Sequence, residues 1–245
     1  MNSGYYAACA GLRVQTQALD LLANNLANLN TNGYLGQQPT FRSLVAVKYG
    51  VAASPLTAAI NDFNVLGSTR LDLSDGNLQP TGNALDLAIE GDGFFVVKSE
   101  NGNLYTRNGS FKESPRGQLI TADGDAVLDE QNRPIILPSG EVSISADGTI
   151  SVQGAVVAKL RIVQFKPDAA PTPQGSSYYD VPDNGVRPAA TASVRQGAVE
   201  ASNVNPMMAV VNLIAVQRYA DMLQRALSAY YSDFNRVAAE DLPKV

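Results

Sequence analysis

Apolar residues at both ends of the chain recur at alternating steps of three and four positions. Near the N-terminus, neither glycine nor proline interrupts residues 12–32. Near the C-terminus, Asn205 is suited to cap a helix, Pro206 suits its first turn, and the next glycine or proline is Pro243. Such an alternation, when it persists over several heptads, is typical of coiled coils. The two stripes are Leu12, Leu19, Leu22, Leu26 and Leu29, and Leu213, Val216, Ala220, Leu223, Leu227, Tyr230, Phe234 and Val237.

The middle of the chain has a different pattern. Short apolar runs such as LDLAIEG, GFFVVKS and AKLRIVQF are separated by Asn-Gly and Asp-Gly pairs. These pairs favour the tight turns that connect antiparallel strands. Residues 80–166 are therefore predicted to form an antiparallel all-β domain. The segment that follows is rich in proline and poor in large apolar residues, which indicates an extended connection.

Together these patterns predict an α+β fold, in which paired, long, coiled-coil-like N- and C-terminal helices flank a central antiparallel all-β domain. Neither stripe can be buried by its own helix, so we expect the helices to pair with each other, with those of other subunits, or with both. The predicted order is an N-terminal helix, a linker, the β domain, an extended return connection and a C-terminal helix. The corresponding ranges are 1–32, 33–79, 80–166, 167–204 and 205–245.

The composition excludes many common kinds of catalytic site. Histidine is absent and Cys9 is the only cysteine, which removes the usual general base and the common nucleophile pairs and zinc sites. The Gly-x-Gly in IEGDGFF lacks the third glycine and the following helix of a dinucleotide site. The carboxylates of the β segment lie mostly in turns, although a glycosidase would need only two of them. We expect no catalytic, cofactor-binding or metal-binding residues and no cofactor.

The charge and hydropathy of the chain limit the classes of partner that it is expected to bind. The net charge of −5 argues against a nucleic acid, and the longest apolar run near the C-terminus, MMAVVNLIAVQ, is too short to span a membrane. No small-molecule substrate is expected. The N-terminus lacks the basic and apolar regions of a conventional signal peptide.

Three segments resemble the bacterial flagellar rod and hook family of axial proteins. They are LANNLANLNTNGY near the N-terminus, residues 81–128 in the β segment, and residues 196–227 near the C-terminus. The resemblance implies a structural, non-enzymatic subunit of the flagellar basal-body rod, which polymerises through its terminal helices into a tube that acts as a drive shaft. It further implies contacts with copies of itself and with other rod and hook proteins. Export would use the flagellar type III apparatus, without a cleaved signal peptide.

Within this family, the chain length and the short 129–195 region are most like the proximal rod subunits, with the distal rod subunits as the close alternative. Two other classes stay open. One is a secreted, β-rich enzyme that acts on cell-wall glycan and uses its helices as oligomerisation arms. The other is a self-contained coiled-coil scaffold, which the match over residues 81–128 disfavours.

The asparagines of the N-terminal segment are assigned two roles. If the neighbouring elements in a tube are other helices, some of the amides can donate and accept hydrogen bonds across subunits without adding charge. Asn30, Asn32 and Gly33 suit the left-handed conformation that ends a helix. The alternative is a run of surface amides around an ordinary helix end. The predicted assembly interface combines the leucines of both stripes and Val216, Ala220, Tyr230 and Phe234 with the amides of Asn24, Asn25 and Asn28.

Overall fold

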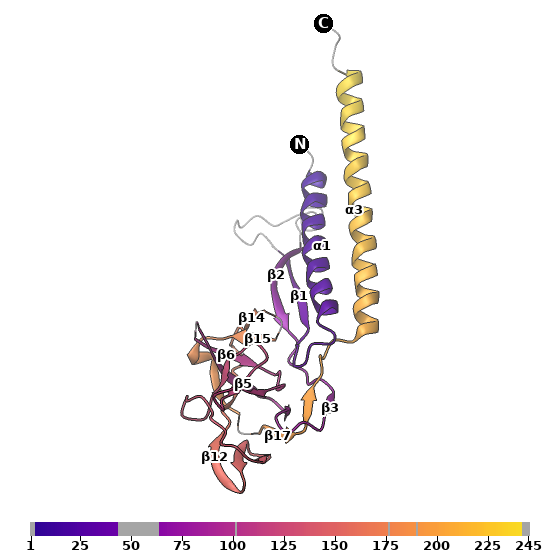
Figure 1. The fold of residues 1–245 in the computed structure, drawn as a ribbon. Helices are drawn as coiled ribbons and strands as arrows, with labels where there is room; N and C mark the ends of the chain where they lie inside the picture. Colours follow the sequence, from indigo (N-terminus) through magenta and orange to yellow (C-terminus); the bar gives the residue numbers. More distant parts are fainter. Residues whose placement is uncertain (1–2, 44–63, 101, 176, 190, 242–245) are drawn as a thin grey trace. The chain divides into compact units, whose positions relative to one another are not determined.

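The computed structural model describes residues 3–43, 64–100, 102–175, 177–189 and 191–241 of the 245-residue chain (Figure 1). These residues belong to two compact units. Unit 1 comprises Met1–Ala27, Gln37–Arg70 and Asn205–Val245. Unit 2 comprises Asn28–Gly36 and Leu71–Val204. No helix in the described part of the chain is both long and apolar enough to cross a membrane.

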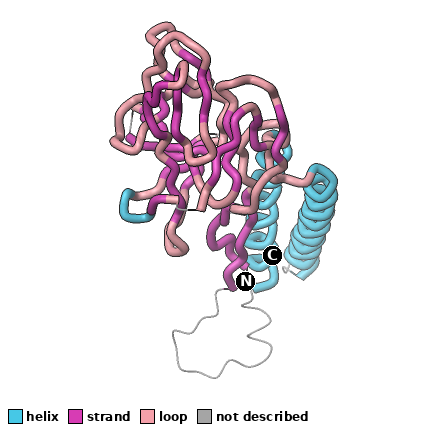
Figure 2. Tube along the Cα trace, turned by 90° about the horizontal axis from the view of Figure 1, so that it is seen from below, coloured by secondary structure: helices cyan, strands magenta, loops and turns pink. Residues whose placement is uncertain are grey.

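Unit 1 consists of two helices and a two-stranded sheet. The helices are α1, Ser3–Ala27, and α3, Pro206–Asp241, and the sheet pairs β1, Gln37–Ser43, with β2, Asn64–Leu71. The helices lie side by side and run in opposite directions (Figures 1 and 2). Asn205 caps α3 as expected, since its side-chain Oδ1 accepts a hydrogen bond from the Met208 N–H at 3.1 Å.

The fold-class prediction was wrong in describing the two helices as long and coiled-coil-like. The buried face of α1 is centred on Val14, Ala18 and Leu21, whereas Leu22 is the only buried member of the leucine stripe. One reason is that α1 packs against both α3 and β1, so its buried face is broader than a coiled-coil seam. The stripe of α3 is only partly covered. The structure supports an α+β class, with one helix from each end of the chain and a largely antiparallel β domain between them in sequence.

Unit 2 is built from short strands, and all the strand pairs that the structure describes in it are antiparallel. Its largest sheet has the order β14-β15-β6-β5-β9-β8-β7, with β13 paired to β5 and β16. Smaller sheets pair β10-β11-β12, β17-β4 and β18-β3. The strands are β3 Leu78–Pro80, β4 Leu87–Glu90, β5 Phe94–Ser99, β6 Gly102–Thr106, β7 Lys112–Glu113, β8 Leu119–Ile120, β9 Ala126–Val127, β10 Val142–Ile144, β11 Thr149–Val152, β12 Ala155–Lys159, β13 Ile162–Phe165, β14 Thr172–Gln174, β15 Tyr178–Asp180, β16 Val186–Pro188, β17 Ser193–Gln196 and β18 Ala198–Glu200.

Pairing between distant segments explains the strands outside residues 80–166. β3 lies in the segment that was expected to be a linker, and its partner β18 lies in the expected return connection. β17 pairs with β4, and β15 pairs with β6. These strands are too short to be recognised from their own apolar pattern. They form because the partner strand satisfies their backbone N–H and C=O groups.

Strand β5 separates two clusters of apolar side chains in unit 2. Successive residues of a strand point to opposite faces, so Phe94 and Phe95 enter different clusters. Phe94 stacks on Phe165 with 4.1 Å between ring centroids. Phe95 meets Phe111 edge to face at 5.1 Å. Because both faces of β5 are covered, the run GFFVVKS is almost continuously apolar rather than alternating.

Replacement of Phe95 by Ala is predicted to lower the free energy of unfolding of unit 2 by about 3–5 kcal/mol, because the ring is fully buried and its removal leaves a cavity. Urea denaturation followed by circular dichroism measures the change. Val156→Ala is the control, since Val156 is 74% exposed and its truncation should cost less than about 0.5 kcal/mol. Equal losses in the two variants would contradict this assignment of the core.

Candidate assembly interface

One face of α3 is turned toward α1. Along α3, Ala209 is buried and the predicted stripe residues Leu213, Val216, Ala220, Leu223 and Leu227 are half-buried, whereas most of the other described side chains are exposed. Gly11 of α1 lies against Leu223 of α3. A Cβ atom added at position 11 would lie 3.3 Å from the Leu223 Cδ1 atom. A small residue on α1 therefore lets a large one on α3 approach closely. This row of α3 is the surface that α1 covers.

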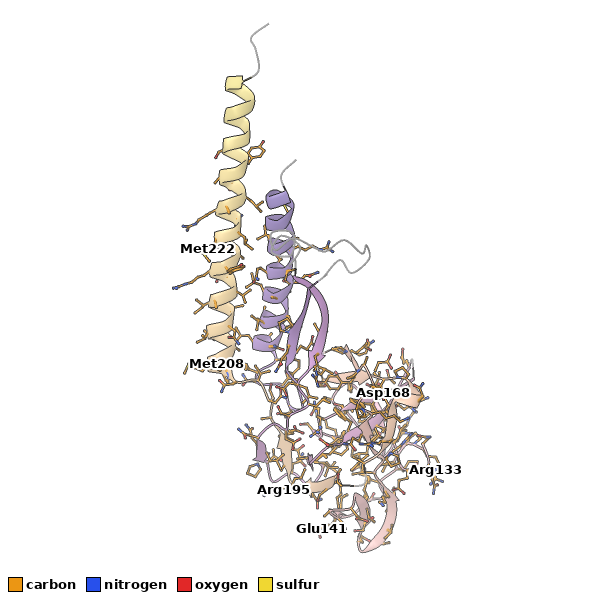
Figure 3. All side chains as sticks on the ribbon, turned by 180° about the vertical axis from the view of Figure 1, so that it is seen from behind. Arg133, Glu141, Asp168, Arg195, Met208 and Met222 are labelled. Atoms are coloured by element: carbon orange, nitrogen blue, oxygen red, sulfur yellow. The ribbon has the colours of Figure 1, made fainter. Side chains whose placement is uncertain are left out.

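The opposite face of α3 also carries apolar side chains, and these are exposed. Met207 is 76% exposed and Met222 is 60% exposed. Figure 3 shows Met208 and Met222 on the side of α3 away from α1. At 100° per residue these side chains share one face of the helix with three other exposed apolar residues and with the exposed Arg218 and Arg225. The set, here called the outer face of α3, is Met207, Met208, Val211, Ile214, Tyr219 and Met222.

A polar strip separates the two apolar faces on one side of α3. It contains the exposed residues Gln217, Asp221, Gln224 and Ser228, which recur at helical spacing. A helix that packs on one neighbour has one apolar stripe, and the rest of its surface is polar. α3 instead carries apolar side chains on two faces, with a polar strip between them, an arrangement that suits a helix with neighbours on two sides.

The structure places the predicted interface residues in several environments. Leu22 and Asn25 are buried, and Asn24 is exposed. The side chains of Tyr230 and Phe234 lie outside the described residues. The remaining predicted residues are half-buried, and they are Leu12, Leu19, Leu26, Asn28, Leu29, Leu213, Val216, Ala220, Leu223 and Leu227.

Asn25 has a well-defined role within unit 1. Its side-chain Nδ2 donates a hydrogen bond to the Gln37 carbonyl at 2.8 Å, and its Oδ1 accepts one from the Gln37 N–H at 2.9 Å. The amide thus pairs with both backbone groups of the first residue of β1. Because Asn25 is only 7% exposed, it ties the strand to α1 in a site poor in water.

The turn after α1 belongs to unit 2. Gly33 has a φ of +67° and takes the left-handed conformation, as predicted. Asn30 and Asn32 do not, so that part of the prediction was wrong. Asn32 instead donates a hydrogen bond from Nδ2 to the Ser110 hydroxyl at 3.0 Å. Its amide is used to hold the turn against the β strands rather than to form the helix cap.

Unit 2 buries an ion pair next to this turn. Arg107 Nη1 lies 3.1 Å from Glu200 Oε2 and 3.1 Å from Asp75 Oδ1, and the Arg107 and Glu200 side chains are each only 1% exposed. The other Glu200 oxygen, Oε1, accepts a hydrogen bond from the Gly76 N–H at 2.8 Å. Burial raises the pKa of the Glu200 carboxyl, although the Arg107 charge acts in the opposite direction. The Glu200 carbonyl accepts a hydrogen bond from the Gly33 N–H at 2.7 Å.

Asn203 makes a second set of bonds beside this ion pair. Its Oδ1 accepts a hydrogen bond from the Gly36 N–H at 2.7 Å, and its Nδ2 donates to the Asp72 and Ser74 carbonyls at 2.9 Å each. The Asp72 N–H also donates to the Gly36 carbonyl at 2.8 Å. Taken together, these groups form the connector clasp, defined as Gly33, Gly36, Asp72, Ser74, Gly76, Arg107, Glu200 and Asn203.

The described surface of unit 2 has a groove of about 520 Å³, lined by Glu130, Asn132, Arg161, Ile162, Val163, Val186, Arg187 and Pro188. Only one carboxylate lines it, so it lacks the carboxylate pair of a glycosidase. Within the described residues, no group of His, Cys, Asp or Glu side chains is arranged to hold a metal ion.

A helix with two apolar faces, attached to a compact β unit, defines a class of structural subunits that associate through their helices. Comparisons with known proteins agree with this class. Residues 6–34 match the family model of flagella basal body rod proteins, residues 88–152 match the flagellar hook protein FlgE/F/G D1 domain, and residues 195–236 match the flagellar basal body rod FlgEFG protein C-terminal model.

Curated relatives match along most or all of the chain. The flagellar basal-body rod protein FlgF of Caulobacter vibrioides is 32% identical over 253 residues, which covers 100% of both chains. The FlgG rod protein of Buchnera aphidicola subsp. Baizongia pistaciae is 32% identical and covers 93% of this chain and 95% of its own. The FlgG protein of Bacillus subtilis is 31% identical over 89% of this chain. The chain belongs to the family of flagellar basal-body rod proteins, which confirms the resemblance read from the sequence.

Two features of the site escaped the sequence analysis. The outer face of α3 is visible in the sequence, because Met207, Val211, Ile214 and Met222 recur at helical spacing. It was missed because one three–four stripe had already been assigned to the helix. The Arg107–Glu200 ion pair carries no sequence signal, since its partners are separated by 93 positions.

Asn25→Ala is predicted to destabilise the contact of β1 with α1 by about 1–3 kcal/mol, because two backbone groups of Gln37 lose their partners. The local measurement is hydrogen exchange of the Gln37 amide, which should become faster. Gln17→Ala is the matched control, since it removes an exposed amide from the same helix. Unchanged exchange at Gln37 in the Asn25 variant would contradict this role.

Proposed function

We propose that this chain is a structural subunit of the bacterial flagellar basal-body rod and that it polymerises through its terminal helices into the axial tube. The observation that carries this proposal is that large apolar side chains lie on two faces of α3, of which α1 covers only one. An exposed row of Met, Val, Ile and Tyr side chains along a helix costs solubility in a free monomer and marks an interaction surface. Family membership supports the same assembly.

The partner proposed for the outer face is a helix of a neighbouring axial subunit, either another copy of this chain or another rod or hook protein. Three of the six residues of this face, Met207, Met208 and Met222, are methionines, whose unbranched and polarisable side chains adapt to a partner of different sequence. The polar strip of α3 would then face a more hydrated part of the assembly. The side-chain amides of Asn24, in α1, and of Asn28, directly after α1, are proposed to form hydrogen bonds across contacts between subunits.

The remaining properties follow from the proposed rod function. The terminal segments 1–32 and 205–245 would provide the helical contacts, and the β region would form the outer part of the rod. The protein would be located in the basal body, which it would reach through the flagellar type III export apparatus. Of the two subunit types weighed, the proximal rod subunit is the one we propose. Within the described residues, no observation favours the glycan-acting enzyme.

Substitutions on the two faces of α3 separate contacts within the subunit from contacts between subunits. Met222→Asp is predicted to leave the monomer intact, because this side chain is largely exposed, but to block rod assembly and motility. Leu223→Asp should also impair the packing of α1 against α3, since it places a charge in the row that α1 covers. Circular dichroism of the purified monomer and swimming assays of complemented strains provide the measurements.

Ser228→Asp is the matched control for these substitutions. It adds the same charge to the polar strip of α3, where the side chain is already exposed. Swimming should therefore be retained. If the Met222→Asp strain swims as well as the Ser228→Asp strain, the outer face of α3 does not contact a neighbouring subunit and the proposal is wrong in its central step.

A further inference from the structure

The outer face of α3 combines apolar side chains with positive charge. Arg218 and Arg225 are exposed, lie seven positions apart, and fall near the middle of this face at 100° per residue. Asp221 is within one helical turn of both, yet neither arginine forms an ion pair with it or with any other described residue. The face therefore offers a neighbour two free guanidinium groups as well as apolar contact.

α1 has an exposed face of complementary character. It lies opposite the buried residues Val14 and Ala18, and its described side chains are small or polar. Asp20 is near the middle of this face, is the only acidic residue of α1, and forms no ion pair with a described residue. The set, here called the exposed face of α1, is Arg13, Thr16, Gln17, Asp20, Ala23, Asn24 and Ala27.

We propose that the outer face of α3 packs against the exposed face of α1 in a neighbouring copy of this chain, with the Asp20 carboxylate paired to the Arg225 guanidinium. This proposal rests on the proposed rod function and names the partner of the outer face. Two outer faces packed on each other would bring arginines against arginines, which like-charge repulsion opposes. Because the two proposed faces differ, the contact is heterologous and can repeat from copy to copy without closing into a dimer.

The direction of the helices follows from the assembly. In a tube whose axis runs along the helices, all copies point the same way, and α1 and α3 of one chain run in opposite directions (Figure 1). The α1 of a neighbour therefore runs antiparallel to α3. A large side chain can then approach a small one between copies, as Leu223 approaches Gly11 within the chain.

Charge selects one register for this antiparallel contact. If Asp20 lies opposite Arg225, Ala23 lies opposite Met222 and Arg13 lies opposite the uncharged Ser232. Arg218 then lies opposite Ala27, whose small side chain leaves the guanidinium access to water. If Asp20 instead lay opposite Arg218, Arg13 would lie opposite Arg225, and the two positive charges would repel each other.

The proposed pair cannot form within one chain. Gly11 lies against Leu223, so in the antiparallel pair Asp20 is level with Ile214 of its own α3. Arg225 is eleven positions farther along, which is about 16 Å at 1.5 Å per residue. Any contact between Asp20 and Arg225 therefore reports a neighbouring copy.

Charge reversal tests the pair. Asp20→Arg and Arg225→Asp each place like charges opposite each other at every contact between copies. Each should reduce the amount of this chain in isolated basal bodies by about tenfold or more, with a matching loss of swimming. The double variant restores opposite charges in reversed order, so both readouts should recover. Both side chains are exposed, and circular dichroism of the purified variants checks that the helices are retained.

Arg218→Asp is the matched control for the register, because it makes the same substitution one heptad away on the same face. Combined with Asp20→Arg, it should not restore swimming.

Disulfide cross-linking gives a second measurement that does not depend on charge. In a Cys9→Ala background, Asp20→Cys with Arg225→Cys should give a ladder of dimers, trimers and larger products when basal bodies are oxidised. Asp20→Cys with Arg218→Cys should not, since Arg218 is seven positions, or about 10 Å, from the proposed contact and a disulfide requires Cα atoms within about 7 Å.

Recovery in the Asp20→Arg, Arg225→Asp double variant, together with the ladder, supports the proposal. Three outcomes overturn it while leaving the rod function in place: normal assembly of both single variants, failure of the double variant to recover, or recovery with Arg218→Asp in place of Arg225→Asp. Failure of the double variant would mean that the charges pair with another protein. Absence of the unsubstituted chain from basal bodies would instead refute the rod function, and this proposal with it.

Discussion

A helix with apolar residues on two opposite faces cannot bury both against a single neighbour, and this constraint governs unit 1. α1 covers the row from Ala209 to Leu227 only in part, and the outer face of α3 stays exposed. The free energy that would come from removing these side chains from water is therefore not realised within one chain. In the proposed assembly, the outer face of α3 is the place where a helix of a neighbouring subunit would cover these side chains.

Unit 2 reaches a compact state in a different way. Its two apolar clusters lie on opposite faces of β5, and its short strands pair with partners that are distant in sequence. The aromatic contacts around Phe94 and Phe95 and the antiparallel ladders are satisfied within the chain. The two units therefore differ: unit 2 contains its own core, whereas α3 of unit 1 leaves large apolar side chains exposed.

Polar residues at the junctions of the two units act locally. Asn25 binds both backbone groups of Gln37 inside unit 1, and Asn203 binds three backbone segments inside unit 2. An amide can donate and accept at once, so it can replace a strand partner where the chain turns. The richness of the sequence in asparagine around residues 24–32 is explained in part by such bonds. Asn32, for example, reaches Ser110 rather than ending the helix.

The sequence by itself determined the features that depend on neighbouring residues. The absence of glycine and proline between Gly11 and Gly33 indicated α1, Asn205 and Pro206 marked the start of α3, and the Asx-Gly turns with their apolar runs indicated antiparallel strands. Helix periodicity, capping and tight turns are local, and their signals lie within a few residues. The three segments that resemble rod and hook proteins were long enough to identify the family.

Only the tertiary structure decided which apolar residues are covered and which polar residues meet. The buried face of α1 is set by β1 as well as α3, so Val14, Ala18 and Leu21 lie at its centre instead of the leucine stripe. β3 and β18 exist because they pair with each other, and the Arg107–Glu200 ion pair joins residues with no common local pattern. Such contacts depend on which distant segments the whole fold brings together, and no short stretch of sequence contains that information.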